Sequence, residues 1–276
     1  MPHLQEGNSL APRNLLFGKV TVSIVSHGHG EMIPCLLDQL ARYPTHVARV
    51  IVTHNIPGDA SYSTKDLLFE VVTIDNEKPL GFGANHNQAF RHCETDYFCV
   101  MNPDIHFIEE PFDTLLKLDV NPAVAILAPK VITPQGDNDG NARSFPTPWD
   151  LVKKLFGCYD GIFLGNEEKE IDYPDWLAGM FLLVKSDKYS ELKGFDESFR
   201  LYYEDVDLSA RAWKKGFGVS LCKNAVVMHD ARKSSHSEFR YFIKHIKSAL
   251  LFFFKYYGRY PARKAFLENV RNAKVS

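Results

Sequence analysis

Long hydrophobic runs are scarce in this chain of 276 residues, although 45% of its residues are hydrophobic. The longest run, Ser248 to Phe254, falls well short of the roughly 20 apolar residues that a membrane-spanning helix needs. Residues 1–14 are polar and lack the apolar core of a secretion signal. These absences predict a soluble globular protein that is large enough to bury a substantial core.

Cysteine is scarce as well, and its spacing excludes two classes of small domain. The five cysteines stand scattered at Cys35, Cys93, Cys99, Cys158 and Cys222. They show neither the paired spacing of a zinc site nor that of a disulfide framework. The sequence therefore predicts a protein of a reducing compartment, the cytoplasm.

Charge is nearly balanced overall, at −2, but it is unevenly distributed along the chain. Residues 231–276 hold eleven Lys or Arg against two acids, a net charge of +9, which leaves −11 for the remainder. Because that remainder is acidic and no nucleic-acid-binding motif is present, no nucleic acid partner is expected.

The basic tail has the pattern of an amphipathic helix, because apolar residues recur every three or four positions with cations between them. Such a helix suits anionic lipid headgroups, and it also suits packing on a sheet with its cations solvated. The apolar positions are Phe239, Phe242, Ile243, Ile246, Leu250, Phe253 and Tyr257, and the cations are Arg240, Lys244, Lys247 and Lys255.

Short apolar runs and an amphipathic segment alternate in the first half of the chain. The runs are rich in β-branched residues, which is typical of buried strands in a parallel sheet. This order predicts an α/β fold with a mostly parallel central sheet flanked by helices. The predicted strands are Val20–Ser26, Val47–Thr53, Phe69–Ile74 and Tyr97–Met101, and a helix is predicted over Glu31–Arg42.

Two segments follow predicted strands at the edge where ligands of such sheets bind. In Pro79–Phe90, Gly81 and Gly83 permit close backbone approach ahead of a helix whose first amides can meet an anion. This segment nearly matches the dinucleotide fingerprint but lacks its third glycine, so a nicotinamide-dependent oxidoreductase is one alternative. Asp104, in an Asn-Pro-Asp turn, is well placed to meet a Mg²⁺ or Mn²⁺ ion that neutralises a diphosphate, although a simple turn has the same composition.

The second half predicts further strands and helices around one long loop. A loop of this length is a binding element or disordered, and Arg143 within it can approach a substrate. Trp176 precedes small residues that allow a bulky group to approach the backbone. The predicted elements are helix Pro111–Leu118, strand Ala123–Val131, loop Thr133–Trp149, strand Trp176–Val184, helix Ser186–Leu192, and strands Val219–Cys222 and Ala225–Met228.

Three carboxylates, Glu204, Asp205 and Asp207, cluster at the start of another predicted helix. Because the apolar face of that helix must point inward, Asp205 is expected at the mouth of a cleft. Asp207 and Arg211 are four positions apart and are predicted to form a surface pair without a chemical role. The structural alternative is that acids stabilise a helix N-terminus electrostatically.

Six motifs occur in an order that resembles one enzyme family. They are Ser26-His27-Gly28-His29, Gly81-Phe82-Gly83 with Asn85 and Asn87, Asn102-Pro103-Asp104-Ile105, Asp175-Trp176-Leu177-Ala178-Gly179, Gly194-Phe195-Asp196, and Tyr203-Glu204-Asp205-Val206-Asp207-Leu208. The chain resembles bacterial family 2 glycosyltransferases of the GT-A fold, most closely the WbbL-type rhamnosyltransferases of O-antigen and cell-wall linker assembly. The resemblance spans about Val20 to Tyr257.

The resemblance implies roles for individual residues. Asp205 would be the general base that deprotonates the acceptor hydroxyl, and Glu204 would orient the acceptor. Asp104 would meet the metal-diphosphate, and His229 would be a further ligand of the Mg²⁺ or Mn²⁺ ion. The implied donor-binding residues are Ser26, His27, Asn55, Gly81, Gly83, Asn85, Asn87, Asn102 and Asp104, and the implied acceptor-binding residues are Arg143, Trp176 and Gly179.

The resemblance also implies an activity and a domain organisation. The expected reaction is inverting transfer of L-rhamnose from dTDP-L-rhamnose to a polyprenyl-diphosphate-linked N-acetylglucosamine, by a peripheral protein on the anionic inner face of the cell membrane. Alternatives are a UDP-hexose donor on the same fold and a non-catalytic glycan- or lipid-binding module.

The expected domain divisions are an extension (1–18), a GT-A domain (19–230) with donor half 19–132 and acceptor half 133–230, and a basic helical region (231–276). Two departures from the family are Asn102 and His54, which stand where many members have acids.

Overall fold

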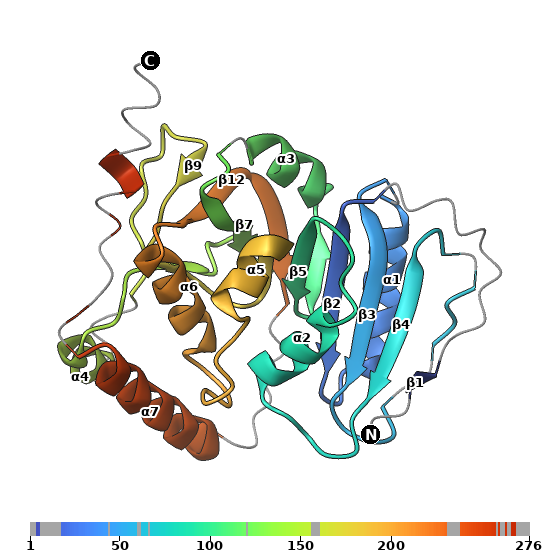
Figure 1. The fold of residues 1–276 in the computed structure, drawn as a ribbon, viewed down its shortest axis with the longest axis horizontal. Coiled ribbons are helices and arrows are strands. Elements are labelled where there is room, and N and C mark those ends of the chain that lie inside the picture. Colours follow the sequence, from blue (N-terminus) through green and yellow to red (C-terminus); the bar gives the residue numbers. More distant parts are fainter. Residues whose placement is uncertain are drawn as a thin grey trace.

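In the computed structural model, one twisted sheet runs through the molecule, with α1 behind it and α2 and α5 in front in the view of Figure 1. The helices are η1 (Gly30–Met32), α1 (Ile33–Ala41), α2 (Phe82–Phe90), α3 (Pro111–Leu118), α4 (Pro148–Leu155), α5 (Ser186–Leu192), α6 (Glu204–Lys214) and α7 (Glu238–Lys255). The structure describes residues 4–5, 18–43, 45–59, 62–65, 67–119, 121–155, 161–230, 238–257, 259, 263 and 266–268.

The strands of the main sheet are β1 (Leu4–Gln5), β2 (Val20–Ser26), β3 (Val47–His54), β4 (Glu70–Asp75), β5 (Tyr97–Met101), β6 (Ile105–Phe107), β7 (Val124–Ile132), β9 (Ile171–Asp172), β11 (Phe181–Lys185) and β12 (Gly218–His229). Within the described residues their order is β1, β4, β3, β2, β5, β11, β7, β12 and β6, with β9 paired to β12. Two further strands, β8 (Ala142–Arg143) and β10 (Trp176–Leu177), form a small antiparallel sheet of their own.

The long strands point the same way, which collects their carboxyl ends at one edge. β4, β3, β2 and β5 are parallel neighbours, and β7 and β12 are parallel to each other. Antiparallel β11 lies between β5 and β7, so these two strands also share one direction. The chain order reverses between β2 and β5, which is the position where ligands bind in sheets of this kind. The predicted mostly parallel α/β sheet is therefore confirmed.

Two predicted element boundaries are wrong. The segment Trp176–Val184 forms two strands, β10 and β11, because the chain passes from the small sheet to the main sheet at Gly179. A Cβ atom at Gly179 would lie 3.1 Å from the Phe82 ring, so this break depends on glycine. The two short strands predicted between Val219 and Met228 are one strand, β12, with a register shift between Cys222 and Val226.

The α7 helix docks on the body through a face different from the predicted one. Ala249, Phe252 and Tyr256 are buried, whereas the predicted apolar positions Leu250 and Tyr257 are 60% and 88% exposed. The side chains of Phe239 and Arg240, both part of the predicted pattern, lie outside the described residues. In the part of the chain that the structure describes, no helix is long and apolar enough to cross a membrane.

Candidate active site

The register between β6 and β12 brings Asp104 beside His229. Ile105 pairs with His229 across these strands, and the Asp230 amide donates to the Asp104 carbonyl at 3.0 Å. As a result His229 Nε2 lies 3.3 Å from Asp104 Oδ1, although the two residues are 125 positions apart in the chain. The structure therefore assembles the two residues that the resemblance assigned to a metal.

Asp139 holds the other nitrogen of the His229 ring. It lies in the loop that follows β7, the parallel neighbour of β12, and its Oδ2 is 2.9 Å from His229 Nδ1. Burial lowers the pKa of His229, but the nearby negative charges of Asp104 and Asp139 outweigh burial and raise it above its ordinary value. A carboxylate on the second ring nitrogen is the usual support of a metal-binding histidine.

Asp104 also faces open space. A cavity of about 270 Å³ lies between α1 and the strand ends, and its lining includes Glu31, Asp104, His106 and Asp230. Among the described residues, Asp104 Oδ1 has no hydrogen-bond partner, although His229 lies near it. The described residues contain no group of three or more His, Cys, Asp or Glu side chains arranged to hold a metal.

Asp205 lies in the first turn of α6, where two backbone amides fix its carboxylate. Gly179 donates to Oδ2 at 3.0 Å, and Val206 donates to Oδ1 at 2.8 Å. The Cβ that Gly179 lacks would lie between the Phe82 ring at 3.1 Å and Asp205 Cβ at 3.8 Å. The acid thus sits where α2 of the first half meets the acidic turn of the second half.

Burial sets the ionisation of the acidic pair. Burial raises the pKa of Asp205, while the Gly179 and Val206 amides and the Arg143 guanidinium act to lower it. Glu204 is only 5% exposed, and burial together with the neighbouring Asp205 carboxylate holds its pKa well above the ordinary value. Asp205 is therefore a stronger base than an exposed aspartate.

The small sheet brings the predicted acceptor residues to this pair. Trp176 of β10 is the register partner of Arg143 of β8, and the Arg143 guanidinium lies 5.8 Å from the centre of the Trp176 ring. The Trp176 indole donates to the Ser144 carbonyl at 2.9 Å. Arg143 and Gly179, which are 36 positions apart in the sequence, thereby both act on Asp205, and Trp176 lies beside Arg143.

An asparagine network organises the predicted donor side. Asn76 donates to Asn55 Oδ1 at 3.0 Å and to Asn85 Oδ1 at 2.7 Å, and all three side chains are buried. Asn55 also accepts from the Leu80 amide at 2.8 Å, and Asn85 donates to the Gly81 carbonyl at 3.0 Å. The sequence analysis missed Asn76, whose position directly after β4 was the available signal.

Ser26, His27 and Asn102 stand at or just after the carboxyl ends of β2 and β5. Ser26 Oγ accepts from the His29 amide at 3.1 Å, and His27 Nδ1 lies 3.1 Å from Asn55 Nδ2. The Asn102 amide donates to the Met180 carbonyl at 2.9 Å, which links the metal turn to the segment before β11. His54, at the end of β3, lies 3.6 Å from Asp59 through Nδ1 and Oδ2.

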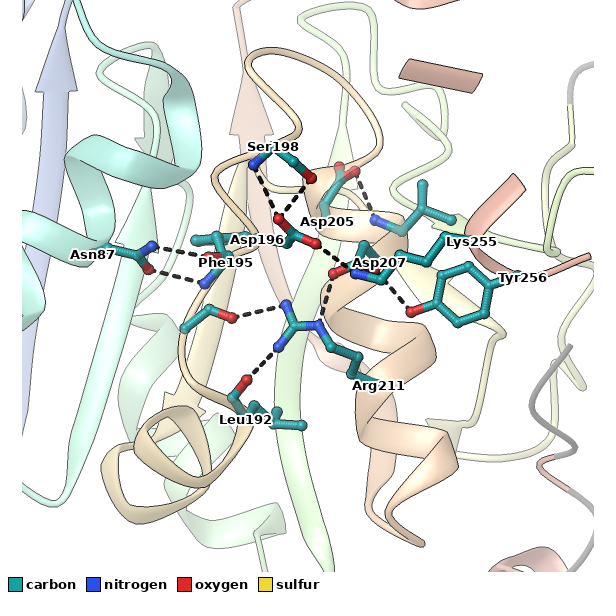
Figure 2. Close-up of polar contacts among 12 residues, drawn as sticks. Asn87, Leu192, Phe195, Asp196, Ser198, Asp205, Asp207, Arg211, Lys255 and Tyr256 are labelled. Atoms are coloured by element: carbon teal, nitrogen blue, oxygen red, sulfur yellow. Dashed lines mark hydrogen bonds and ion pairs between the residues drawn. The ribbon is translucent and has the colours of Figure 1, made fainter. Parts of the chain in front are cut away.

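Asn87, Gly81 and Gly83 join the two halves of the molecule. Asn87 donates to the Phe195 carbonyl and accepts from the Phe195 amide, both at 2.9 Å, as Figure 2 shows. A Cβ at Gly83 would lie 2.6 Å from Phe195 Cβ, and one at Gly81 would lie 2.6 Å from the Arg200 carbonyl oxygen. These glycines are therefore required by packing against the second half.

The predicted surface pair of Asp207 and Arg211 is wrong. Asp207 is 0% exposed, and Arg211 Nε donates to it at 2.7 Å. The other Arg211 nitrogens donate to the carbonyls of Leu192 and Gly194, so the guanidinium fills a fixed site (Figure 2). The i, i+4 spacing predicted the correct partners, but it could not show that residues distant in the sequence bury Asp207.

Comparison with characterised proteins identifies the class of enzyme. No protein-family model matches the chain. It is 28% identical to rhamnosyltransferase WbbL of Escherichia coli (strain K12) over 273 residues, which cover 93% of this chain and 98% of the relative. It is also 28% identical over 170 residues to the N-acetylglucosaminyl-diphospho-decaprenol L-rhamnosyltransferase of Mycobacterium tuberculosis (strain ATCC 25618 / H37Rv), which cover 57% of this chain and 54% of the relative.

The chain is a glycosyltransferase. Its similarity to WbbL-type rhamnosyltransferases confirms the predicted resemblance. The enzyme also shares the GT-A fold of solved structures. GalNAc-T7 with UDP, GalNAc and Mn²⁺ matches with a TM-score of 0.57 and 16% identity over 81% of this chain, which spans 45% of that protein. The mannosyltransferase PcManGT of Pyrobaculum calidifontis, in complex with GDP-Man and Mn²⁺, matches with a TM-score of 0.57 and 15% identity over 87% of this chain and 68% of its own.

Proposed function

We propose that this glycosyltransferase moves L-rhamnose from dTDP-L-rhamnose to a polyprenyl-diphosphate-linked N-acetylglucosamine with inversion at the sugar carbon. The observation that carries the chemistry is the placement of Asp205, whose carboxylate is fixed by the Gly179 amide and lies within the electrostatic influence of the candidate acceptor residue Arg143. The rhamnose rests on similarity to both relatives, whose names state rhamnosyl transfer, and the lipid-linked N-acetylglucosamine rests on the name of the mycobacterial relative.

In the proposed reaction Asp205 takes the proton of the acceptor hydroxyl. The hydroxyl oxygen attacks the anomeric carbon of the donor, and the bond from that carbon to the diphosphate oxygen breaks on the opposite face. The raised pKa of Asp205 suits this work, because a base with a pKa nearer neutrality accepts a proton more readily in the transition state. Burial and the Asp205 charge raise the pKa of Glu204 and so favour its protonated form, which can donate a hydrogen bond to the acceptor sugar.

Asp104 and His229 fit a divalent cation. Asp104 presents an oxygen without a hydrogen-bond partner among the described residues, and His229 presents Nε2 while Asp139 supports Nδ1. These are oxygen and imidazole ligands of the kind that Mn²⁺ accepts. When bound, the cation would offset the negative charge that develops on the departing diphosphate.

The outward face of α7 supports attachment to an anionic membrane that carries the acceptor. Phe242, Ile243, Leu250 and Phe254 are exposed and cover about one third of the helix circumference at 3.6 residues per turn, and Tyr257, just after the helix, is exposed as well. Lys244 and Lys247 lie on the same exposed part of the helix. An apolar face with cations at its margin fits anionic headgroups above an acyl layer.

Calorimetric titration tests the donor assignment. dTDP-L-rhamnose, UDP-GlcNAc and UDP-galactose are each titrated with and without Mn²⁺. We expect saturable, metal-dependent binding of dTDP-L-rhamnose alone. Preference for a UDP-sugar would keep the transferase and reject rhamnose, and binding of none of the three would reject the proposed donor site.

The Asp205→Asn variant tests catalysis in the same preparations. We expect it to bind the donor as the parent does and to lower turnover by a factor on the order of 10² or more, because the general base is lost. Turnover close to that of the parent would place the base elsewhere.

A further inference from the structure

The inward face of α7 packs on the segment that delivers the acidic pair, and Phe145 and Trp176 also pack against this contact. One hydrophobic cluster contains Phe199, Tyr203, Val206 and Ala210 from that segment and Ala249, Phe252 and Tyr256 from α7. Ser248 Oγ donates to the Leu201 carbonyl at 2.9 Å. In Figure 1, α7 lies beside the loop that leads into α6.

That segment contains a strained turn. Tyr202 and Tyr203, which directly precede Glu204, both have φ near +70°, a conformation that non-glycine residues rarely adopt. Such a residue is energetically unfavourable and persists only where its surroundings enforce it. The α7 helix supplies those surroundings, because the His245 ring lies 5.4 Å from that of Tyr202 and 5.3 Å from that of Tyr203.

A polar clamp completes the contact, as Figure 2 shows. The Tyr256 hydroxyl donates to Asp207 Oδ1 at 2.8 Å, and Lys255 Nζ lies 2.6 Å from the same oxygen. Lys255 Nζ also lies 2.6 Å from Asp196 Oδ2. Asp207 in turn donates its backbone amide to the Tyr203 carbonyl at 2.9 Å, which ties the clamp to the strained turn.

We infer that α7 is a positioning element for catalysis, in which Lys255 and Tyr256 hold Asp207 so that the strained turn presents Asp205 to Gly179. The inference rests on the proposed role of Asp205 as the base. It gives α7 two separate tasks, because the inward face fixes the base whereas the outward face remains available for a membrane. Lys255 and Tyr256 are positioning residues, since neither side chain reaches the candidate site itself.

The test is the double variant Tyr256→Phe with Lys255→Met, assayed on a water-soluble acceptor without vesicles. We expect kcat per folded molecule to fall by roughly 10- to 100-fold, because displacement of a catalytic group by about 1 Å costs up to about 10² in rate. The donor affinity of the double variant should stay within about twofold of the parent value. The single variant Lys255→Arg keeps a positive charge beside Asp207 and Asp196 and should therefore retain most of the turnover. Amide hydrogen exchange over residues 201–207 should become faster.

The chain provides a matched control for a purely structural effect. Tyr97 donates to buried Asp119 at 2.7 Å and Lys185 lies 3.1 Å from it, so Tyr97→Phe with Lys185→Met removes the same two kinds of partner elsewhere. This control should lose thermal stability but keep kcat and the exchange rate of residues 201–207.

Two outcomes would overturn the inference. Unchanged exchange over residues 201–207 in the double variant would show that the clamp does not hold the turn, whichever sugar the enzyme transfers. Faster exchange with unchanged kcat would show that the turn does not position the base. Turnover is measured with the nucleotide sugar that calorimetry selects, so failure of the rhamnose assignment is read separately from failure of the clamp.

Discussion

At the residue scale, the acidic pair shows how burial assigns different tasks to neighbouring carboxylates. Glu204 and Asp205 are adjacent in the sequence, yet only Asp205 receives the Gly179 amide and the influence of Arg143. Both pKa values are raised by burial, and that of Glu204 is raised further by the charge of Asp205. The Gly179 amide and the Arg143 guanidinium therefore favour the charged form of Asp205.

The pH dependence of turnover tests this assignment. Asp205 must be ionised to act as the base, so turnover should fall as pH decreases through its raised pKa, above the ordinary range of aspartate. Arg143→Gln removes a cation that lowers this pKa, and the acid limb of the kcat profile should move to higher pH. Lys117→Gln, on the exposed side of α3, should leave the limb in place. A limb that stays fixed or moves to lower pH in Arg143→Gln would contradict the assignment.

At the element scale, the candidate metal site depends on strands that end at the same edge of the sheet. Asp104, His229 and Asp139 follow or end β5, β12 and β7, three strands that point the same way. Short β6 then pairs its Ile105 with His229 and completes the approach. The candidate site thus arises from strand direction and register, because none of the three residues indicates a metal site by its local sequence alone.

Metal-dependent binding of dTDP measures this arrangement without any turnover. Asp104→Ala should weaken it because a ligand is lost. Asp139→Asn should weaken Mn²⁺-dependent binding by about 10- to 100-fold, the usual effect of losing the support of a metal-binding histidine. Asp137→Asn, an exposed change in the same loop, is the control. Equal Mn²⁺ dependence in the parent and in both site variants would remove the metal assignment.

At the scale of the whole molecule, the two faces of α7 have different surroundings: one packs on the protein and the other is exposed. Its inward face meets the acidic turn, and its outward face exposes Leu250 and Phe254, which are 60% and 85% exposed. Lys255, predicted among the lipid-facing cations, instead contacts Asp196 and Asp207. Lys244 and Lys247 are the other predicted cations of α7 whose side chains the structure describes, and both are exposed.

Sedimentation with anionic vesicles tests the outward face. Leu250→Ser with Phe254→Ser should reduce the fraction bound, because apolar area that enters the acyl boundary is lost. Removing the charges of Lys244 and Lys247 should also reduce it, and high salt should mimic only this second effect. Leu164→Ser changes a side chain that is 91% exposed elsewhere and should have no effect. If the variants and the parent sediment alike, the membrane contact must lie on another surface.

Local patterns along the chain predicted much of the fold. The strands Val20–Ser26 and Tyr97–Met101 and the helix Pro111–Leu118 agree with the structure residue for residue, because their apolar spacing is set by the face they bury. The helix that begins at Glu204 also agrees at its start. The break at Gly179 was missed because the residues on either side are apolar, and only the Phe82 ring from another element requires it.

The sequence by itself determined the α/β alternation, the acidic helix start and the resemblance to one glycosyltransferase family, since these depend on residue type and spacing within short segments. Only the tertiary structure decided that Asp139 supports His229, that Asn76 joins the asparagine network and that α7 turns Lys255 inward. Each of these depends on strand register or on which face of a helix finds a partner. A helix such as α7, with apolar residues on most of its circumference, does not specify its buried face until the rest of the fold offers a surface.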